Sequence, residues 1–241
     1  MKTLFFARDR LGIKPFYYAL VNNVFLFASE IRAIIATGIV SNKISAKGMS
    51  QYLGFQSSYA PSTIIEDIKL LEPATFGTLD HENLSIKFQK YWSMSLNEKI
   101  LSGKSETFQI KVVRERVISA VESRLLADVN IAAFLSGGID SSVIVAAMSQ
   151  LNENSINTFS LVHDQNIYDE SKYSDLIAKK YKTNHFKIKV DKPEVLSIIN
   201  EAINKIDSPS IDGINSFLVS KKINQIGIRV ALSGLGGDEV F

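Results

Sequence analysis

Short apolar runs separated by turn residues fill the start of this 241-residue chain, a pattern typical of β-strands. The runs are TLFFA, FYYAL and NVFLFAS, which together span residues 3–28. The pair Asn22-Asn23 stands between the last two runs and predicts a hairpin turn. We therefore expect antiparallel strands at the beginning of the chain.

Helical and strand-like patterns then follow each other up to residue 92. The segment SEIRAIIAT predicts a helix that is capped by Ser29 and ended by Gly38, and a second helix is expected from Ser45 to Leu53. The segments TIIEDIKLLEPATFGTLD and LSIKFQKYW favour further strands. The first part of the chain is thus predicted to be mixed, with a large share of β-structure.

The pattern changes at about residue 93. The segment SMSLNEKILSGKSE is polar and predicts a linker over residues 93–105. The next segment, TFQIKVVRERVISAVESRLL, predicts an amphipathic helix with a charged outer face. Its apolar residues at helical spacing are Phe108, Val112, Val113, Val117, Val121 and Leu125.

Strands and helices alternate over the rest of the chain, which predicts an α/β domain with a parallel sheet and right-handed crossovers. The predicted strands cover residues 131–135, 156–162, 185–190 and 228–232, and the predicted helices cover about 141–150, 170–181, 193–204 and 215–226.

Composition narrows the classes of function. The hydrophobic content of 46% supports one or two ordinary domains, and the net charge of +2 with no basic run argues against a nucleic-acid partner. The chain has no cysteine, which excludes disulfides, cysteine-based zinc sites and a thiol nucleophile within it. The first apolar patch ends at Arg8, Asp9 and Arg10, too early for a membrane span, so we expect a cytoplasmic protein without a membrane partner. These three charged residues are interpreted as an ion-pair group between domains.

Two glycine loops follow predicted strands. One is Ser136-Gly137-Gly138-Ile139-Asp140-Ser141-Ser142, after IAAFL, and the other is Ser233-Gly234-Leu235-Gly236-Gly237-Asp238-Glu239, after IRVAL. In a parallel sheet such loops lie where ligands bind, beside the N-termini of helices.

The composition of these loops suits phosphate binding. Glycines let backbone amides approach a phosphate, and serines add hydroxyl donors. Asp140 repels a phosphate unless a divalent cation lies between them, and Asp238 supplies a second carboxylate for that cation. The loops lack the lysine of GxxxxGK[ST]. One SGG alone is more often a tight turn, but two matched loops that each carry an aspartate favour a nucleotide site.

The motif FLSGGIDSS resembles the PP-loop of ATP pyrophosphatases. Together with DESKYSDLIAKKY and SFLVSKKINQIGIRVALSGLGGDEVF, it resembles the synthetase domain of the glutamine-hydrolysing asparagine synthetase family. The earlier motifs ARDRLGIKPFYY, FASEIRAI and IIEDIKLLEPATF resemble the second half of that family's glutaminase domain. The resemblance implies the C-terminal part of a class II, N-terminal-nucleophile glutaminase domain over residues 1–92. It also implies the N-terminal part of an ATP-pyrophosphatase (PP-loop) synthetase domain over residues 106–241.

Members of this family adenylate a carboxylate with Mg-ATP, release pyrophosphate, and let ammonia from glutamine displace AMP. The resemblance implies ATP and Mg²⁺ as cofactors, aspartate or a related acid as acceptor, and glutamine or ammonia as nitrogen donor, and it leaves a homodimer open. It assigns the pyrophosphate to Ser136, Gly137, Gly138 and Ser141, the Mg²⁺ to Asp140 and Asp238, and the adenosine to Leu135, Leu161, Ser233 and Gly234. Glu239 is the candidate catalytic residue and acts through the ligands of the metal.

The sequence departs from the family pattern at three places. Lys2 stands where the family has its cysteine nucleophile, and the preceding glutamine-binding segments are missing, so we interpret Met1 as a truncated or internal start. Leu235 replaces an acidic residue that is proposed to manage protons. Ile211 falls about where asparagine synthetases place an arginine for aspartate.

These departures keep several alternatives open. Asp207 or Asp212 could meet an amine or hydroxyl of another acceptor. The chain could be another PP-loop ligase, such as a β-lactam-forming synthetase, or a non-catalytic remnant that binds nucleotide.

Overall fold

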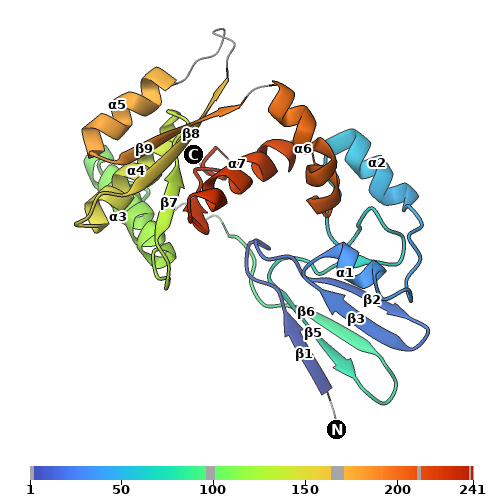
Figure 1. Ribbon diagram of the computed structural model, residues 1–241. Coiled ribbons are helices and arrows are strands. Elements are labelled where there is room, and N and C mark those ends of the chain that lie inside the picture. Colours follow the sequence, from blue (N-terminus) through green and yellow to red (C-terminus); the bar gives the residue numbers. More distant parts are fainter. Residues whose placement is uncertain are drawn as a thin grey trace. The chain divides into compact units, whose positions relative to one another are not determined.

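The computed structural model describes residues 3–95, 101–163, 171–190, 192–210, 213–238 and 240. Backbone contacts divide the chain into two compact units, each discontinuous in sequence (Figure 1). Unit 1 comprises Met1–Asn97 and Ile203–Gly213, and unit 2 comprises Glu98–Ala202 and Ile214–Phe241. Five residues discussed above lie outside the described part of the chain, namely Met1, Lys2, Ile211, Asp212 and Glu239.

Unit 1 contains two antiparallel three-stranded sheets, with strand orders β1-β5-β6 and β3-β2-β4. Their strands are β1 (Thr3–Ala7), β2 (Tyr17–Val21), β3 (Val24–Ala28), β4 (Lys69–Leu70), β5 (Thr75–Asp80) and β6 (Ile86–Lys90). The predicted hairpin is confirmed, because β2 pairs with β3 and both Asn22 and Asn23 have positive φ angles, 50° and 61°. A buried cluster of Phe6, Tyr18, Leu71 and Leu79 joins the two sheets.

Two helices complete the first part of unit 1, α1 (Ile31–Ile35) and α2 (Ala46–Phe55). Ser45 caps α2 as predicted, since its hydroxyl accepts a hydrogen bond from Gly48 N. The predicted Ser29 cap of α1 is wrong. The carboxylate of Asp207 instead accepts hydrogen bonds from Ile31 N and Arg32 N, at 2.6 and 3.0 Å. The side-chain cap at the start of this helix therefore comes from a residue 176 positions away in sequence.

Unit 2 is built on a four-stranded sheet with the order β10-β7-β8-β9, and every neighbouring pair is parallel. The strands are β7 (Ile131–Phe134), β8 (Asn157–His163), β9 (Asn184–Val190) and β10 (Val230–Leu232). The helices are α3 (Glu106–Arg124), α4 (Ile139–Leu151), α5 (Ser171–Tyr181), α6 (Lys192–Lys205) and α7 (Gly213–Gln225). The last three residues of α6 and the first residue of α7 are assigned to unit 1. The predicted mixed α/β fold with a parallel sheet is confirmed.

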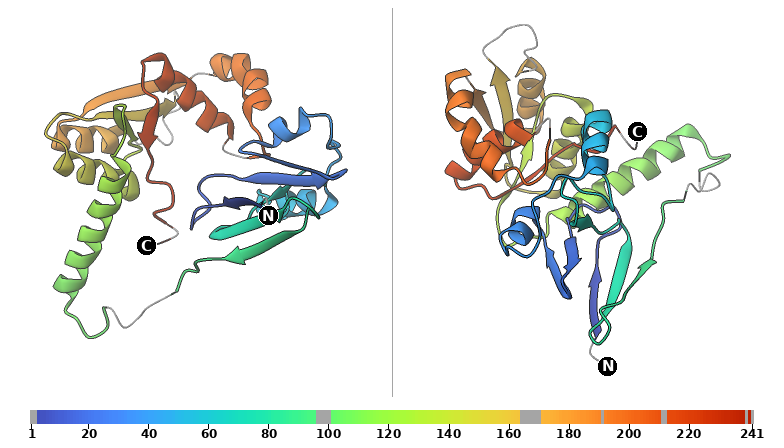
Figure 2. Two further views of the ribbon diagram at one scale, coloured as in Figure 1. Left: turned by 90° about the horizontal axis from the view of Figure 1, so that it is seen from below. Right: turned by 90° about the vertical axis from the view of Figure 1, so that its right-hand side faces the viewer.

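Helices lie on both faces of this sheet (Figures 1 and 2), and apolar side chains pack beneath them. On one face, Val121 of α3, Val145 and Met148 of α4 and Ala178 of α5 pack together. The other face carries Phe159 with Val219 and Ile223 of α7. The carboxyl ends of β7 and β10, which pair with each other, consequently lie at one edge of a three-layer unit.

The predicted apolar face of α3 is only partly buried. Val121 is 4% exposed, as expected for a core residue, but Phe108 and Val113 are 45% and 38% exposed. The apolar face that the spacing predicts is thus buried only in the C-terminal part of α3, where Val121 packs in the core cluster together with Ile118 and Leu125.

None of the helices in the described part of the chain is long and apolar enough to cross a membrane.

Candidate functional site

The loop after β7 leaves the start of α4 without a side-chain cap. Its N-cap residue is Gly138, whose backbone is extended and whose lack of a side chain removes a capping acceptor. Ser141 Oγ and Ser142 Oγ donate to the Gly138 carbonyl, at 3.1 and 2.7 Å. Gly137 has a φ of +96°, which a residue with a Cβ rarely adopts. Backbone N–H groups at this helix start are therefore suited to an external anion.

Hydroxyl groups brace the same loop. Ser136 Oγ lies 3.0 Å from Ser141 Oγ and accepts a 3.3 Å hydrogen bond from Gly138 N. These contacts hold Ser136, Gly138 and Ser141 of the predicted phosphate loop together.

The loop after β10 packs directly against the loop after β7. A β-carbon placed on Gly234 would lie 2.6 Å from Ser141 N and 2.8 Å from the carbonyl carbon of Asp140. A β-carbon on Gly237 would lie closer than 3.0 Å to Cγ and both carboxylate oxygens of Asp140. Gly234 is thus required by the backbone of a loop about a hundred residues earlier in sequence, whereas a side chain at position 237 would have to displace the Asp140 carboxylate.

The structure brings most of the predicted site residues to this junction. Asp140, Ser141, Gly234 and Gly237 are in direct proximity, and Ser233 and Asp238 are their chain neighbours. The described residues contain no group of three or more His, Asp or Glu side chains that could hold a metal ion. A metal ion at this junction would therefore have at most two carboxylate ligands among the described residues, those of Asp140 and Asp238.

The two leucines assigned to adenosine differ in environment. Leu135 is 0% exposed and packs in the core cluster beneath the loop, while its N–H donates to Phe159 O at 2.7 Å. Leu161 is partly buried on β8 and packs with the cluster on the opposite face of the sheet.

A cavity that the sequence did not indicate adjoins this junction within unit 2. It has a volume of about 970 Å³, and its lining includes Asp140, Ser233, Gly234, Leu235 and Gly237. Its remaining walls come mainly from α3 and α4. Two apolar residues inside the glycine loops, Ile139 and Leu235, also line the cavity and are the feature of the sequence from which an apolar wall could have been predicted.

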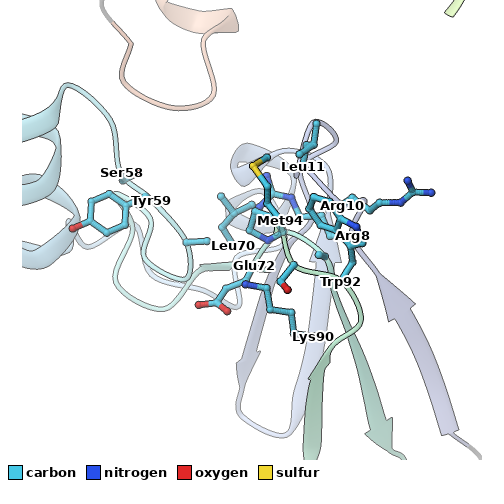
Figure 3. A pocket seen from close by; sticks show the side chains of 14 residues that line it. Arg8, Arg10, Leu11, Ser58, Tyr59, Leu70, Glu72, Lys90, Trp92 and Met94 are labelled. Carbon is cyan, nitrogen blue, oxygen red and sulfur yellow. The ribbon is translucent and has the colours of Figure 1, made fainter. Parts of the chain in front are cut away.

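A separate cavity of about 630 Å³ lies within unit 1. Figure 3 shows Arg10, Leu11, Trp92 and Met94 gathered at one end of it, with Tyr59 across from them.

The charged loop beside this second cavity is held by backbone contacts. The Arg8 guanidinium donates to the carbonyls of Lys14, Leu71 and Gly12, and burial lowers its pKa. The Asp9 carboxylate accepts from the N–H groups of Lys14, Ile13 and Leu11, and these hydrogen bonds lower the pKa of Asp9. Arg8 and Asp9 thus brace a loop of unit 1.

Comparison with known proteins identifies the relatives of this chain. The family model for asparagine synthase matches residues 112–241, and the model for a glutamine amidotransferase domain matches residues 1–92. "Asparagine synthetase [glutamine-hydrolyzing] 3" of Bacillus subtilis is 31% identical over 255 residues, which cover 99% of this chain and 41% of that protein. "Amidase chyE" of Penicillium rubens is 28% identical, over 98% of this chain and 37% of that protein. The chain thus spans less than half the length of these relatives.

A solved structure with partial similarity is the NH3-dependent NAD synthetase from Campylobacter jejuni. It has a TM-score of 0.34 and 12% sequence identity, over 48% of this chain and 49% of that one. The asparagine synthase match covers more than half of the chain and includes both glycine loops. The chain therefore belongs to the asparagine synthase family.

Proposed function

We propose that this chain carries the ATP site of an ATP-dependent amidotransferase of the asparagine synthase type, which activates a carboxylate by adenylation. The observation that supports this most directly is the packing of Gly234 and Gly237 against Asp140 and Ser141. It unites two loops with the same chemistry at one edge of a parallel sheet, where nucleotide ligands bind.

In this proposal the loop after β7 holds the pyrophosphate part of ATP. Gly137, Gly138 and the uncapped first turn of α4 offer backbone N–H groups, and Ser136 and Ser141 offer hydroxyls. The positive end of the 13-residue helix favours the negative charge. Ser233 and Gly234, with Leu135 and Leu161, are assigned to the adenosine side.

The carboxylate oxygens of the two loops also fit Mg²⁺, which prefers oxygen ligands of this kind. Asp140 and Asp238 would hold the ion, and the ion would supply the positive charge that lets carboxylates and phosphates share one site. Asp140 alone would repel the phosphates that the neighbouring amides attract.

The reaction proceeds in two displacements. An oxygen of the acceptor carboxylate attacks the α-phosphorus of ATP, the bond to the bridging oxygen breaks, and pyrophosphate leaves. Ammonia then attacks the activated acyl carbon, AMP leaves, and the nitrogen loses a proton. The side chain of Leu235 cannot accept this proton, and we assign the catalytic role to Glu239, acting through the ligands of the metal.

The two parts of the chain are assigned to two domains of such an amidotransferase. Residues 1–92 form the C-terminal part of a class II glutaminase domain, and residues 106–241 form the N-terminal part of a PP-loop synthetase domain. Glutamine or ammonia is the nitrogen donor, the acceptor is aspartate or a related acid, and the protein works in the cytoplasm, with a homodimer as one oligomeric form.

The test is a pair of measurements on the 241-residue chain. We expect Mg-ATP to bind in calorimetry and Asp140→Ala to lose that binding. The matched control is Asp128→Ala, which removes a carboxylate that is exposed and has no hydrogen bond or ion pair with a described residue. Equal affinity of the Asp140 variant and the parent chain would contradict the metal assignment.

The second measurement follows pyrophosphate release from Mg-ATP with ammonia and a panel of carboxylic acids. Release that depends on one of the acids supports adenylation. ATP binding without release for any acid would instead favour a nucleotide-binding remnant.

A further inference from the structure

The cavity of unit 1 carries an excess of positive charge. Its lining contains three cations, Arg8, Arg10 and Lys90, and one carboxylate, that of Glu72. Neither Arg10 nor Lys90 has an ion pair or a side-chain hydrogen bond with any residue in the described part of the chain. The neighbouring Asp9 does not line the cavity, and its carboxylate accepts hydrogen bonds from three backbone N–H groups. A cleft lined mainly by one sign of charge attracts ions of the other sign, so the cavity favours an anionic ligand.

Aromatic side chains form two walls of the same cavity. Figure 3 shows Trp92 on one side and Tyr59 across from it. Trp92 is half-buried, whereas 54% of Tyr59 is exposed, which leaves its ring open to a ligand. Leu11 and Met94 add hydrocarbon surface beside Trp92. Aromatic side chains attract other rings through stacked and edge-to-face contacts, so these walls favour a ligand that contains an aromatic ring.

The wall that carries Trp92 is fixed by hydrogen bonds within the chain. Tyr91, the preceding residue, donates from its hydroxyl to the Arg8 carbonyl at 2.7 Å and from its N–H to the Ala74 carbonyl at 2.8 Å. The Ala74 N–H donates in turn to the Asp9 carbonyl at 2.9 Å. The backbone next to Trp92 is therefore tied to the loop of Arg8 and Asp9, and a ligand would not have to order this wall on binding.

The size and the lining of the cavity suit a small molecule at a second site. Its volume of about 630 Å³ lies within the range of small-molecule sites. None of its lining residues belongs to either glycine loop. A ligand in this cavity would thus use a set of residues that the proposed ATP site does not use.

We infer that unit 1 binds a small aromatic anion in this cavity. The ring of the ligand lies between Trp92 and Tyr59, and its carboxylate or phosphate is attracted by the three cations. Aryl carboxylates and aryl phosphates share this chemistry, and binding measurements with one of each separate them. The site does not depend on the proposed adenylation, because no residue of the ATP loops takes part in it.

The fluorescence of Trp92 provides the test, because Trp92 is the single tryptophan of the chain and lines the cavity. We expect 3-phenylpropionate, phenyl phosphate or both to change this fluorescence in a saturable way when added to the 241-residue chain. The tighter of the two identifies the acidic group. The uncharged 3-phenylpropan-1-ol, which has the same ring, should bind more weakly, and acetate, which has no ring, should give no saturable change.

Two pairs of variants locate the binding site. Lys90→Gln removes one lining cation and should weaken binding about two- to fivefold, the range for one exposed charge pair. Lys87→Gln is its matched control, because Lys87 is exposed on the same strand, β6, but does not line the cavity. Tyr59→Leu removes an aromatic wall and should weaken binding about two- to tenfold. Tyr173→Leu is the control for the ring, since Tyr173 is 58% exposed and lies outside the cavity lining. Circular dichroism checks that all four variants keep their fold.

A saturable Trp92 signal that Lys90→Gln and Tyr59→Leu weaken, and that both controls leave unchanged, supports the site. The absence of a saturable signal with both aromatic anions would overturn the inference. Equal binding of the uncharged alcohol, or equal effects of Lys90→Gln and Lys87→Gln, would also overturn it. All these titrations omit nucleotide and Mg²⁺, so their outcome bears on unit 1 alone, and Mg-ATP calorimetry remains the test of the proposed function.

Discussion

The α-carbon of Gly237 packs so closely on the Asp140 side chain that an added β-carbon would lie inside 3.0 Å of the Asp140 Cγ. Gly237→Ala should therefore displace either the loop after β10 or the Asp140 carboxylate. Because both belong to the proposed ATP site, we expect Mg-ATP affinity to fall at least tenfold. Calorimetric titration of the variant with Mg-ATP checks this, and undiminished affinity would show that the junction is not part of the site.

Gly54→Ala is the matched control for this glycine. Gly54 lies within α2, and no atom stands within 4 Å of an added β-carbon. Alanine is favoured over glycine inside a helix by about 0.5–1 kcal/mol. The control should thus leave nucleotide binding unchanged and slightly raise the urea midpoint of unfolding.

Asp207→Ala should destabilise unit 1. The Asp207 carboxylate caps α1 through Ile31 N and Arg32 N, and the Arg32 guanidinium donates to the carbonyls of Asn204 and Lys205. Loss of a helix cap costs about 0.5–2 kcal/mol. Urea unfolding followed by the fluorescence of Trp92, the single tryptophan of the chain, measures the change. Asp128→Ala should leave this transition in place, and an equal effect of both variants would refute the capping role.

Stability should fall with acid through His185. Its ring nitrogens lie 2.9 Å from Thr158 Oγ1 and 3.2 Å from Ser160 Oγ, and burial lowers the pKa of His185. The unfolded chain, with a histidine pKa of about 6.5, then binds a proton more readily than the folded chain. The stabilisation is complete above this pH and decreases as the pH falls below it.

The measurement compares urea midpoints at pH 7.5 and at pH 5.5. His185→Gln should show a smaller loss between them than the parent chain. His81→Gln, at an exposed turn after β5, should keep the parent's loss. A His185 variant with an unchanged pH dependence would disprove the assignment.

Ser149→Ala should stabilise unit 2. Ser149 Oγ is buried in α4 and has no hydrogen-bond partner among the described residues. An unsatisfied buried hydroxyl costs about 1–3 kcal/mol, and alanine is also the better helix former. Thermal unfolding followed by circular dichroism should show a higher midpoint.

Ser123→Ala on α3 serves as the comparison, because the exposed Ser123 Oγ does donate, to Ala120 O at 2.8 Å. Its gain should be smaller than that of Ser149→Ala, since only helix propensity improves and a hydrogen bond is lost. A larger gain at Ser123 would count against the unsatisfied hydroxyl at Ser149.

Local patterns predicted the elements whose causes are local. Asn22-Asn23 adopts the two positive φ angles of a tight hairpin, and Ser45 caps α2, because each effect acts within a few residues. The alternation of strands and helices after residue 130 likewise predicted the parallel sheet, since βαβ units leave few other arrangements.

Predictions failed where distant segments compete with local ones. Ser29 was a suitable cap by type, but Asp207 arrives from the other end of the chain with two acceptor oxygens. Phe108 and Val113 lie on the predicted apolar face of α3, yet they remain 45% and 38% exposed, because helical periodicity specifies a face and not its partner.

The order of residues alone was enough to identify the two glycine loops and the family resemblance and to predict phosphate binding, because backbone freedom and donor groups belong to the residues themselves. Only the folded arrangement brought Gly234 and Gly237 onto Ser141 and Asp140 and opened a cavity with apolar walls beside them. The reason is that β10 pairs with β7, about a hundred residues earlier, and such a pairing depends on the whole sheet rather than on either loop.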